Sequence, residues 1–570
     1  MMFISRVGAH RPGFERKSFV GVVFPVGVLL ILALLTVLPL VSLFVEAFTD
    51  SDGGLTVENF LVTMGDGYNV DVILNTVWLS FLVAVFSLFF GIIFSFGLGR
   101  TSMPCKKMLR AIVVISIISP GFLTAFAYIV LLGPNSGFFN QILRDLLGLV
   151  QTSGPFDIYS GAGFILLSVP MGIGICVLQL VPVLSNMDSS VEEASRLAGA
   201  SMANTFFSIT LRLLTPALLS GFVLTFTISL SLYGIPQILG IDVVSVAIRQ
   251  SILVVNDLKT AAVMSIVVTL IALVAVAVYR RSIAAQKRYI TVGTRGARSD
   301  MFPIGKWKYL IVFLVFVYGL IAFILPYTTL LYISLLRNIT DGLSSENLTV
   351  VHYINLFEDD FTRSSLINSI VLSIASAAGV VLIGVASGYV LVRMETIFRP
   401  FIGYLSILPL GLAGTAFGVA VLLTYINPPL RALGFAGTLI ILALAYTGHF
   451  VAFGVQGIQT ALLQISPELS EAARISGSGR VTTVKDVDLP LIRGSLASTG
   501  LLVAILCFPE LSISIMLQSA DTQVVSTALL TRWNGSGGLQ SASAMATLIF
   551  GVVAIVLSVV YGVVLRPKRK

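Results

Sequence analysis

The feature that most constrains this chain is a series of about twelve apolar segments, each long enough to cross a bilayer as a helix rising about 1.5 Å per residue. The 570 residues are 56% hydrophobic and only 11% charged, which excludes an ordinary soluble globular protein, where about 25% charged is usual. Because backbone amides cannot stay unpaired in hydrocarbon and the sequence lacks the short alternating segments of a β-barrel, the spans must be helices. The expected fold class is an all-α polytopic membrane protein surrounded by lipid, with spans at 19–45, 73–98, 111–132, 160–181, 216–239, 261–279, 309–334, 366–392, 401–423, 437–458, 496–517 and 542–565.

Basic residues predict the orientation of these spans. Arg11, Arg16 and Lys17 precede the first span without a small-residue cleavage site, so the N-terminus is expected in the cytoplasm and the span is expected to be retained. The basic loop 281–308 and the tail 566–570 are expected on the same side, which agrees with an even number of spans. The net charge of +8 therefore indicates orientation, and no nucleic-acid partner is expected.

The two halves of the chain repeat one another. The stretch 75–80 (Asn-Thr-Val-Trp-Leu-Ser) matches 368–373 (Asn-Ser-Ile-Val-Leu-Ser) at an offset of 293 (368 − 75), and Gly91 and Arg100 match Gly384 and Arg393 at the same offset. A parallel repeat predicts two domains of about six spans, related by a pseudo-twofold axis along the membrane normal, with a pathway between them. The expected division is 1–18 (cytoplasmic segment), 19–280 (first domain), 281–308 (basic linker), 309–565 (second domain) and 566–570 (cytoplasmic tail).

Asparagine opens the matching stretch in each half. Asn75 and Asn368 stand near the expected start of the second span of each half, and an asparagine side chain is a favoured N-cap. Both are expected to cap these spans from the outside.

Two polar stretches interrupt the apolar pattern, one after the fourth span of each half. They begin at Glu193 and Glu471, at an offset of 278 (471 − 193), and each ends in a glycine, Gly199 or Gly477. Glycine permits a turn that a residue with a Cβ atom would resist. Each stretch is therefore expected to be a short helix followed by a tight turn.

The start of each short helix also has a signature. Ser466-Pro467-Glu468 combines a hydroxyl N-cap, a proline at the first helical position and an acid at the positive end of the helix dipole, and Asp188 stands at the equivalent cap position of the first half. The loops 186–216 and 464–494 are thus expected to form helix–turn–helix units across the cytoplasmic face, suited to docking in a groove of another protein.

The spacing in these loops resembles the EAA loop of the permease subunits of ATP-binding-cassette (ABC) importers: Glu-Ala-Ala, three residues, Gly, nine residues, Ile, one residue, Leu-Pro. The second copy departs only by Val487 in place of isoleucine, whereas the first has Ser195 for alanine and Arg212 for proline. The resemblance covers nearly the whole chain, and it implies two tandem type I importer permease domains of six helices each, fused in one polypeptide.

The resemblance also implies partners. Each loop would be received by one of two copies of an ABC ATPase subunit, and an extracytoplasmic solute-binding protein would deliver the cargo to a bacterial cytoplasmic membrane. The chain has no Gly-x-x-x-x-Gly-Lys-Ser/Thr phosphate loop, because Gly305-Lys306 lacks the preceding glycine. The chain is therefore expected not to be an enzyme and to bind no cofactor, and ATP is expected to be used by the partner subunit. The residues expected to couple to the ATPase are Glu193, Ala194, Gly199, Glu471, Ala472, Ala473 and Gly477.

One ionisable residue stands deep in an expected span. A carboxylate such as Glu510 is costly in hydrocarbon, which makes it a functional candidate by default, and Pro509 beside it frees a carbonyl and favours a kink. The corresponding stretch of the first half contains Tyr233 and Pro236. Both segments are expected to line or gate the translocation path. The alternative is that Glu510 only forms a hydrogen bond between packed helices.

The sequence gives no reason to expect a metal site. Cys105, Cys176 and Cys507 are far apart, and His449 stands alone on an expected helix. The cysteines are expected to be packing residues, and His449 is expected to form a hydrogen bond between helices.

The cargo can be inferred only from subfamily likeness. The stretches 233–240, 288–290 and 509–514 resemble the ferric iron permease group, which implies ferric iron, with 2-aminoethylphosphonate, thiamine or a polyamine as alternatives. A secondary transporter would also have repeats and a buried carboxylate, but it would run without ATP and without paired loops. A membrane-embedded enzyme would need a cluster of reactive groups, whereas the chain has only three histidines.

Overall fold

The computed structural model describes residues 19–563 except 51, 149–153, 188–189, 287–303, 342–345 and 536–537. The segments 1–18 and 566–570, Asp188 and most of the linker 281–308 therefore lie outside the described residues. Within the described part, regular structure is helical apart from two isolated β-bridges, Thr49–Leu55 and Leu336–Leu348. The all-α fold class is confirmed.

The helices of the first half are α1 (Phe19–Leu32), η1 (Ala33–Val37), α2 (Leu38–Phe48), α3 (Glu58–Gly65), α4 (Gly67–Arg100), α5 (Lys106–Ile118), α6 (Gly121–Leu132), α7 (Phe138–Leu147), α8 (Gly161–Ser185), α9 (Ser190–Leu197), α10 (Met202–Thr205), η2 (Phe206–Thr210), α11 (Leu211–Leu230), α12 (Gly234–Leu239), α13 (Val244–Gln250), η3 (Ser251–Val255) and α14 (Leu258–Gln286).

The helices of the second half are α15 (Trp307–Gly319), η4 (Leu320–Ile324), α16 (Leu325–Ser334), η5 (Ile339–Asp341), α17 (Val351–Glu358), α18 (Asp360–Arg393), α19 (Arg399–Ile407), η6 (Leu408–Gly411), α20 (Gly414–Ile426), η7 (Leu430–Leu433), α21 (Leu439–Leu463), α22 (Pro467–Ile475), α23 (Arg480–Thr483), η8 (Val484–Asp488), α24 (Leu489–Cys507), α25 (Ser514–Leu517), α26 (Val525–Asn534) and α27 (Gly538–Val563).

Ten helices of the described part are long and apolar enough to cross a membrane. The other two expected spans, 111–132 and 401–423, are the third span of each half, and both are broken. Helices α5 and α6 meet at 94°, because Ser119 is extended ahead of Pro120, as a residue before proline prefers. In the second half, α19 and η6 are separated from the 13-residue α20 by extended residues. The number of spans is thus close to the prediction, but the third span of each half is not one straight helix.

Three long helices pack in the same way in each half. In the first half α4, α8 and α11 contact one another, and in the second half α18, α21 and α24 do so. The contact is close enough to require glycine: a Cβ atom on Gly91 would lie 2.5 Å from Cys176 Cβ, and one on Gly384 would lie 2.8 Å from the Gly454 carbonyl carbon. Small residues at such crossings let helix backbones approach in a membrane, where no hydrophobic force joins helices. Gly91 and Gly384, which are 293 residues apart (384 − 91), therefore match in their packing as well as in the sequence.

The two halves exchange their first spans. Helix α2 packs on α20 of the second half, and α16 packs on α6 of the first half. Hydroxyl groups reinforce the second contact: Tyr327 Oη lies 2.5 Å from Ser119 Oγ, and Tyr128 Oη donates to the Ile321 carbonyl over 2.8 Å. Each repeat unit thus supplies a helix that completes the other unit.

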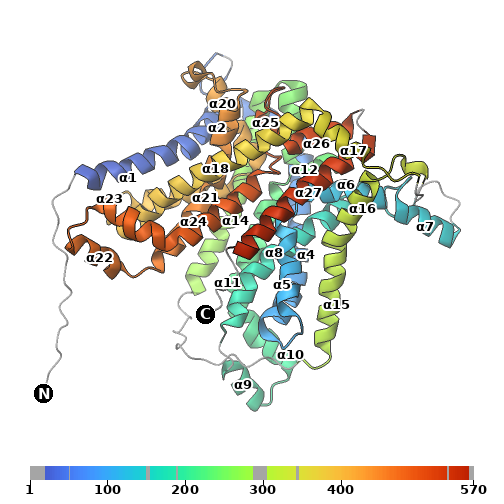
Figure 1. The fold of residues 1–570 in the computed structure, drawn as a ribbon, viewed down its shortest axis with the longest axis horizontal. Coiled ribbons are helices and arrows are strands. Elements are labelled where there is room, and N and C mark those ends of the chain that lie inside the picture. Colours follow the sequence, from blue (N-terminus) through green and yellow to red (C-terminus); the bar gives the residue numbers. More distant parts are fainter. Residues whose placement is uncertain are drawn as a thin grey trace.

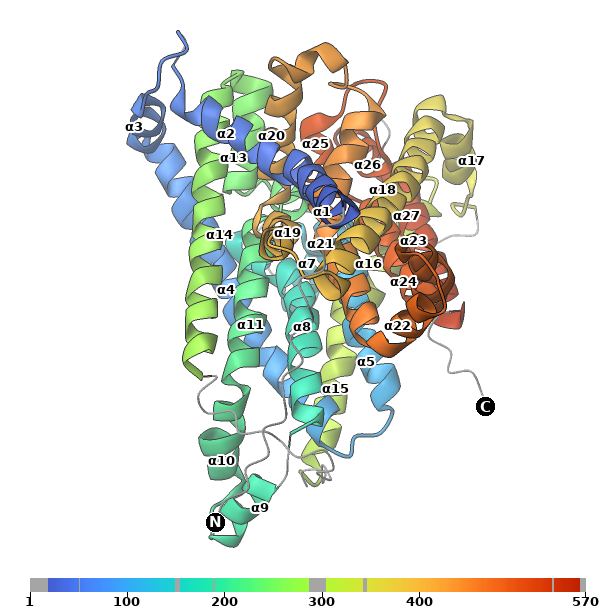
Figure 2. The same cartoon turned by 90° about the vertical axis from the view of Figure 1, so that its left-hand side faces the viewer.

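Figure 1 shows α4, α8 and α11 running nearly vertically and α18, α21 and α24 steeply inclined to them, with α7 projecting away from the bundle. In Figure 2 the short helices α9 and α22 lie in the lower part of the molecule, whereas α3 and α17 lie in the upper part. In Figure 1 the two short helices lie well apart, α9 below α8 and α11, and α22 beside α21 and α24; we call the side of the molecule that carries them the loop end. Helices α3 and α17 mark the opposite end.

One expectation about helix starts is wrong. Helices α4 and α18 begin several residues before Asn75 and Asn368, and their N-caps are Asp66, which accepts from Tyr68 N, and Asp359, which accepts from Thr362 N. The two asparagines instead donate to backbone carbonyls ahead of α13 and α26: Asn75 Nδ2 to Asp242 O over 2.8 Å, and Asn368 Nδ2 to Gln523 O over 3.0 Å. An apolar pattern shows where a helix is buried, but a helix can extend into water beyond it.

Candidate functional site

The first polar loop is a short helix and a turn, as expected. Glu193 and Ala194 are exposed on α9, and Gly199 follows with φ +89°, a conformation that favours glycine. The backbone N–H of Ala200 donates to the Ser195 carbonyl over 3.1 Å, which closes the helix end as in a Schellman turn. The chain then returns through α10 and η2 into the long helix α11.

The second loop repeats this geometry. Helix α22 begins at Pro467, as the Ser-Pro-Glu signature predicted. Glu471 and Ala472 are exposed and Ala473 is half-buried. Gly477 has φ +92°, and Ser478 N donates to the Ala473 carbonyl over 3.1 Å. The structure therefore places all seven coupling candidates on two equivalent helix–turn units.

Each unit also presents an apolar side chain that sequence reasoning missed. Leu197 is 90% exposed and Ile475 is 87% exposed, and the two are equivalent by the loop offset (475 − 197 = 278). Each stands two residues before the glycine of its loop. The signal available in the sequence was a large apolar residue at the same position of two otherwise polar loops.

The candidate path residues lie where the fifth span of each half stops. The segments 216–239 and 496–517 were expected to be single helices, but α11 ends at Leu230 and α24 ends at Cys507. Short helices follow each break. Pro509 therefore does not kink a continuous helix: it lies beyond the helix end, in the turn before α25.

The two breaks meet across the halves. A Cβ atom on Gly234 would lie 3.1 Å from Leu511 Cδ2 and 2.8 Å from Phe122 Cβ. Tyr233, Pro236 and Leu511 are buried. The structure thus brings the neighbourhood of Tyr233 and Pro236 together with that of Pro509 and Glu510 in one closely packed contact.

Hydroxyl groups hold the short helices after the breaks in equivalent ways. Ser245 Oγ donates to the Leu232 carbonyl over 2.6 Å, and Ser526 Oγ donates to the Glu510 carbonyl over 2.5 Å. At the start of the following helices, Val244 N donates to Thr76 Oγ1 and Val525 N donates to Ser369 Oγ. Each of these four bonds gives a backbone group near a break a partner within the protein, as a membrane demands.

The carboxylate of Glu510 is half-buried and stabilises the start of α25. It accepts from Ile513 N at 2.9 Å, from Ser514 N at 3.1 Å and from Ser514 Oγ at 2.9 Å. The same hydroxyl contacts Tyr446 Oη. Leu232 occupies the equivalent position of the first half, as the matching serine bonds show. Only the second half therefore carries a carboxylate at the break.

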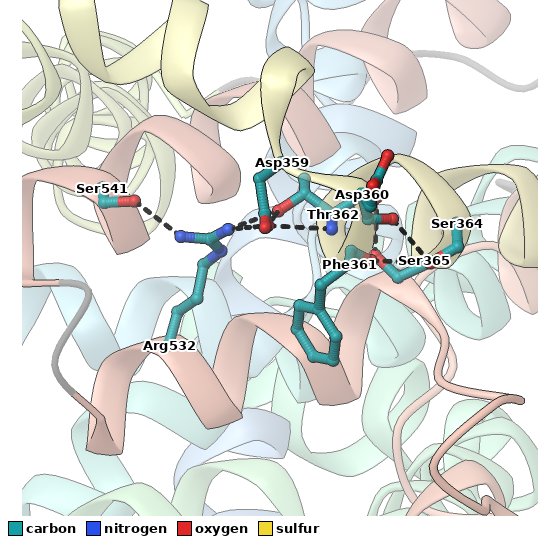
Figure 3. Close-up of polar contacts among 8 residues, drawn as sticks. All are labelled: Asp359, Asp360, Phe361, Thr362, Ser364, Ser365, Arg532 and Ser541. Atoms are coloured by element: carbon teal, nitrogen blue, oxygen red, sulfur yellow. Dashed lines mark hydrogen bonds and ion pairs between the residues drawn. The ribbon is translucent and has the colours of Figure 1, made fainter.

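Arg532 ties the second half together at the opposite end of the molecule (Figure 3). Its guanidinium contacts the Asp359 carboxylate, donates to Thr362 Oγ1 over 2.6 Å and donates to Ser541 Oγ over 3.1 Å. Burial raises the pKa of Asp359, but hydrogen bonds from Thr362 and the charge of Arg532 outweigh burial and hold the pKa below its ordinary value. Helix α26 is thus fixed to the start of α18 and to α27.

Within the described residues no group of three or more His, Cys, Asp or Glu side chains is placed to hold a metal ion. His449 packs against the rings of Phe417 and Phe450, and its Nδ1 is buried without a hydrogen-bond partner in the described part, so the expected bond between helices is not seen at that atom. Cys176 and Cys507 are buried, as expected of packing residues, whereas Cys105 is exposed, so the expectation is wrong for Cys105.

An apolar cavity of about 420 Å³ lies between α4, α8 and the first span of the second half. Its walls include Phe90, Phe94 and Tyr318, and no residue of 231–240 or 508–514 lines it. The walls are apolar apart from Tyr318, whose hydroxyl is already bonded to Ser116 and to the Pro170 carbonyl, so a charged or hydrated solute would find little to replace its water there. This cavity is therefore not part of the candidate path.

Comparison with known proteins gives a consistent picture. Residues 91–291 match the family model described as the binding-protein-dependent transport system inner membrane component. The ferric transport system permease protein FbpB of Actinobacillus pleuropneumoniae is 26% identical over 528 residues, covering 90% of this chain and 75% of that protein. A putative ferric transport system permease protein FbpB 1 of Haemophilus influenzae is 25% identical over 508 residues, covering 87% of this chain and 78% of that protein. The molybdenum transport system permease protein ModB of Escherichia coli is 30% identical over 162 residues, covering 28% of this chain and 68% of that protein.

The contact between the two breaks gives a first prediction. Gly234→Val should force Phe122 and Leu511 apart, at a cost of about 1–3 kcal/mol for overpacking, and should loosen the closed contact. A cysteine placed at Leu511 should then react faster with a maleimide in the Gly234→Val background than in its absence. Gly551→Val is the control, because a Cβ atom there meets no atom within 4 Å. An unchanged reaction rate at position 511 would contradict the prediction.

The Arg532 cluster gives a second prediction. Arg532→Met should destabilise the protein by about 1–2 kcal/mol, since it leaves Asp359 without its charged donor. The neighbouring pair Arg363–Asp360 is exposed, so Arg363→Met should change stability by less than about 1 kcal/mol. Chemical unfolding in detergent measures both.

The pH dependence has a definite sign. Because the folded pKa of Asp359 is lowered, its ionised form stabilises the fold above its unfolded pKa, and this contribution is lost as the pH falls through the folded pKa. The difference between wild type and Arg532→Met should persist from about pH 8 to pH 5 and shrink below about pH 4. A difference that is independent of pH down to that range would argue against the ion pair.

Proposed function

The chain belongs to the family of binding-protein-dependent transport system inner membrane components, the permease subunits of ABC importers, and from this premise we propose that it moves ferric iron inward across a bacterial cytoplasmic membrane. Its relatives are membrane transport components. ATP hydrolysis takes place in a separate ATPase, so this chain is a transport subunit that binds no cofactor of its own. An extracytoplasmic solute-binding protein delivers the cargo.

The single observation that carries the coupling part of this proposal is the pair of equivalent helix–turn units at the loop end. Two copies of an ATPase subunit dock there, one on each unit. Leu197 and Ile475 enter apolar grooves of the ATPases, and Glu193 and Glu471 lie beside them with their carboxylates exposed. A few side chains that become fully desolvated in a pocket of the partner can carry most of the binding energy of an interface. The loop end accordingly faces the cytoplasm, as do both termini.

The path runs between the halves, where the two broken fifth spans meet. Non-helical backbone at membrane depth is tolerated where it is buried in protein or lines a cavity, so the breaks at 231–233 and 508–513 are suitable places for a gate. Closure of the ATPase pair pushes the two loops together and tilts the halves. Gly234 and Leu511 then separate, which exposes Tyr233, Pro236, Pro509 and Glu510 to the solute.

Ferric iron is the favoured cargo because the two ferric permease relatives align over almost the whole chain, including both halves. The molybdenum permease aligns over little more than a quarter of the chain. 2-Aminoethylphosphonate, thiamine and polyamines are the alternatives for the same machinery. An ion-coupled secondary transporter is a different class, and the paired loops argue against it because such a transporter has no ATPase to receive.

The docking role is tested at the second loop. Gly477→Pro should abolish uptake, because proline requires φ near about −65° whereas Gly477 has φ +92°, and Glu471→Arg should abolish uptake by reversing an exposed charge. Both variants should still reach the membrane but should no longer bring down the ATPase. Gly494→Ala is the control, since Gly494 lies in α24 with open space around it. Wild-type uptake by either loop variant would refute the docking assignment.

The cargo and the energy source are tested together. Proteoliposomes that contain the permease, its ATPase and its solute-binding protein should accumulate radioactive ferric iron only when ATP is supplied. Unlabelled ferric citrate should compete with this uptake, whereas molybdate, thiamine and 2-aminoethylphosphonate should not. If one of these three compounds competes instead, ferric iron is refuted as the cargo and that compound takes its place. Uptake by the permease alone under an ion gradient would instead establish a secondary transporter.

A further inference from the structure

A buried ion pair lies beneath the first loop. Arg100 is the last residue of α4, and its side chain is 1% exposed. One terminal nitrogen of its guanidinium donates to Glu192 Oε2 over 2.5 Å, and the other donates to the Met187 carbonyl over 3.1 Å. Glu192 belongs to α9, one residue before the exposed Glu193. The end of a membrane-spanning helix is thus joined directly to the loop helix.

The same carboxylate reaches the other arm of the loop. Thr210 Oγ1, at the end of η2, donates to Glu192 Oε1 over 2.6 Å. The side chain of Glu192 is 5% exposed, so both of its oxygens are shielded from water. Charge-assisted hydrogen bonds in such surroundings are strong, and removing one partner leaves an uncompensated buried charge. Helices α4, α9 and α11 are therefore connected through one carboxylate.

The repeat shows that the second half lacks this bridge. The equivalents of Glu192 and Thr210 are Ser470 (192 + 278) and Asp488 (210 + 278), so the acid and the hydroxyl have exchanged places. Ser470 Oγ donates to Asp488 Oδ1 over 3.0 Å. Asp488 is buried, and its Oδ2 has no hydrogen-bond partner in the described part of the chain.

The arginine of the second half is engaged elsewhere. Arg393 is the equivalent of Arg100 (100 + 293), and its guanidinium donates to the carbonyls of Leu462 and Ile465 at the end of α21, over 3.3 and 3.1 Å. It is half-buried, whereas Arg100 is fully buried. No ion pair joins α18 to α22 among the described residues. Among the described side chains, the hydrogen bond that joins the two arms of the second loop runs from the Ser470 hydroxyl to the Asp488 carboxylate.

We propose that Arg100 and Glu192 are positioning residues that make the first loop the stiffer of the two levers, so that ATPase movement is transmitted mainly through the first half. A loop that is joined to the end of α4 and to the start of α11 moves with these helices as one body. The second loop can shift relative to α18 before the helix follows. Unequal transmission then has a simple origin. The acid and the hydroxyl are Glu192 and Thr210 in the first half, whereas the hydroxyl and the acid are Ser470 and Asp488 at the equivalent positions of the second half.

This inference rests on the proposed docking of an ATPase at both loops, and the experiment separates the two. The double variant Arg100→Met/Glu192→Met removes both charges, which avoids the isolated buried charge that either single variant would leave. It should still bind the ATPase and support ATP hydrolysis, because neither side chain is exposed at the docking surface. Solute transported per ATP hydrolysed should fall about tenfold, within the range of typical couplings between two sites.

Arg393→Met is the matched control in the second half, and it should change the transport per ATP by less than about twofold, because Arg393 bonds only carbonyls of its own half. Thr210→Val is a milder variant that keeps the ion pair and loses one hydrogen bond, and it should lower the ratio by about two- to fivefold. Thr210→Val therefore still tests the proposal if the double variant does not fold.

The outcomes are distinct. Failure of the wild-type protein to bind an ATPase would refute the proposed function itself. If ATPase binding is normal but solute transported per ATP falls equally in the first-half variants and in Arg393→Met, unequal transmission is refuted. An unchanged transport per ATP in both Arg100→Met/Glu192→Met and Thr210→Val would refute it as well. The double variant Ser470→Glu/Asp488→Thr gives the second half the acid and the hydroxyl of the first. It should raise the solute transported per ATP or leave it unchanged, and a clear loss would count against the proposal.

Discussion

The structure depends on one requirement: every backbone N–H and C=O group at membrane depth needs a partner inside the protein. Straight helices meet it by themselves, but the third and fifth spans of each half are broken. At the breaks in the fifth spans the partners are side chains, with Ser245 and Ser526 donating to carbonyls and Glu510 accepting from two backbone N–H groups. The breaks are possible only because neighbouring helices supply these groups, and so the least regular backbone is found where the two halves meet.

The exchange of first spans follows from the same requirement. Helix α2 packs against α20, and α16 packs against α6, so each first span lies against the broken third span of the opposite half. Tyr128 illustrates this, because it lies on the broken span of the first half and donates to a carbonyl within the π-helical turn η4 of the second. The halves are thereby interlocked through contacts made of rings and hydroxyls.

Pseudo-symmetry makes departures from it informative. The helix–turn units match in backbone geometry down to the positive φ of Gly199 and Gly477, and both present an exposed apolar residue. The layers beneath differ, since Glu192 pairs with Arg100 in the first half, whereas among the described side chains no arginine pairs with Asp488 in the second. Glu510 likewise has no acidic counterpart, because Leu232 stands at its position. The two halves therefore share an outline on the surface and differ at buried polar sites.

The sequence by itself determined the membrane fold, the repeat and the two loops, because apolar length, charge and glycine spacing are local properties that survive without knowledge of neighbours. It misjudged the form of two features: Pro509 lies past a helix end instead of kinking a helix, and the caps of α4 and α18 are aspartates that precede the apolar pattern. Only the tertiary structure decided which spans exchange, that Gly234 meets Leu511, and that Arg100 joins Glu192 across 92 residues (192 − 100). These are contacts between residues far apart in the chain, and their free energy depends on burial and geometry that no local pattern contains.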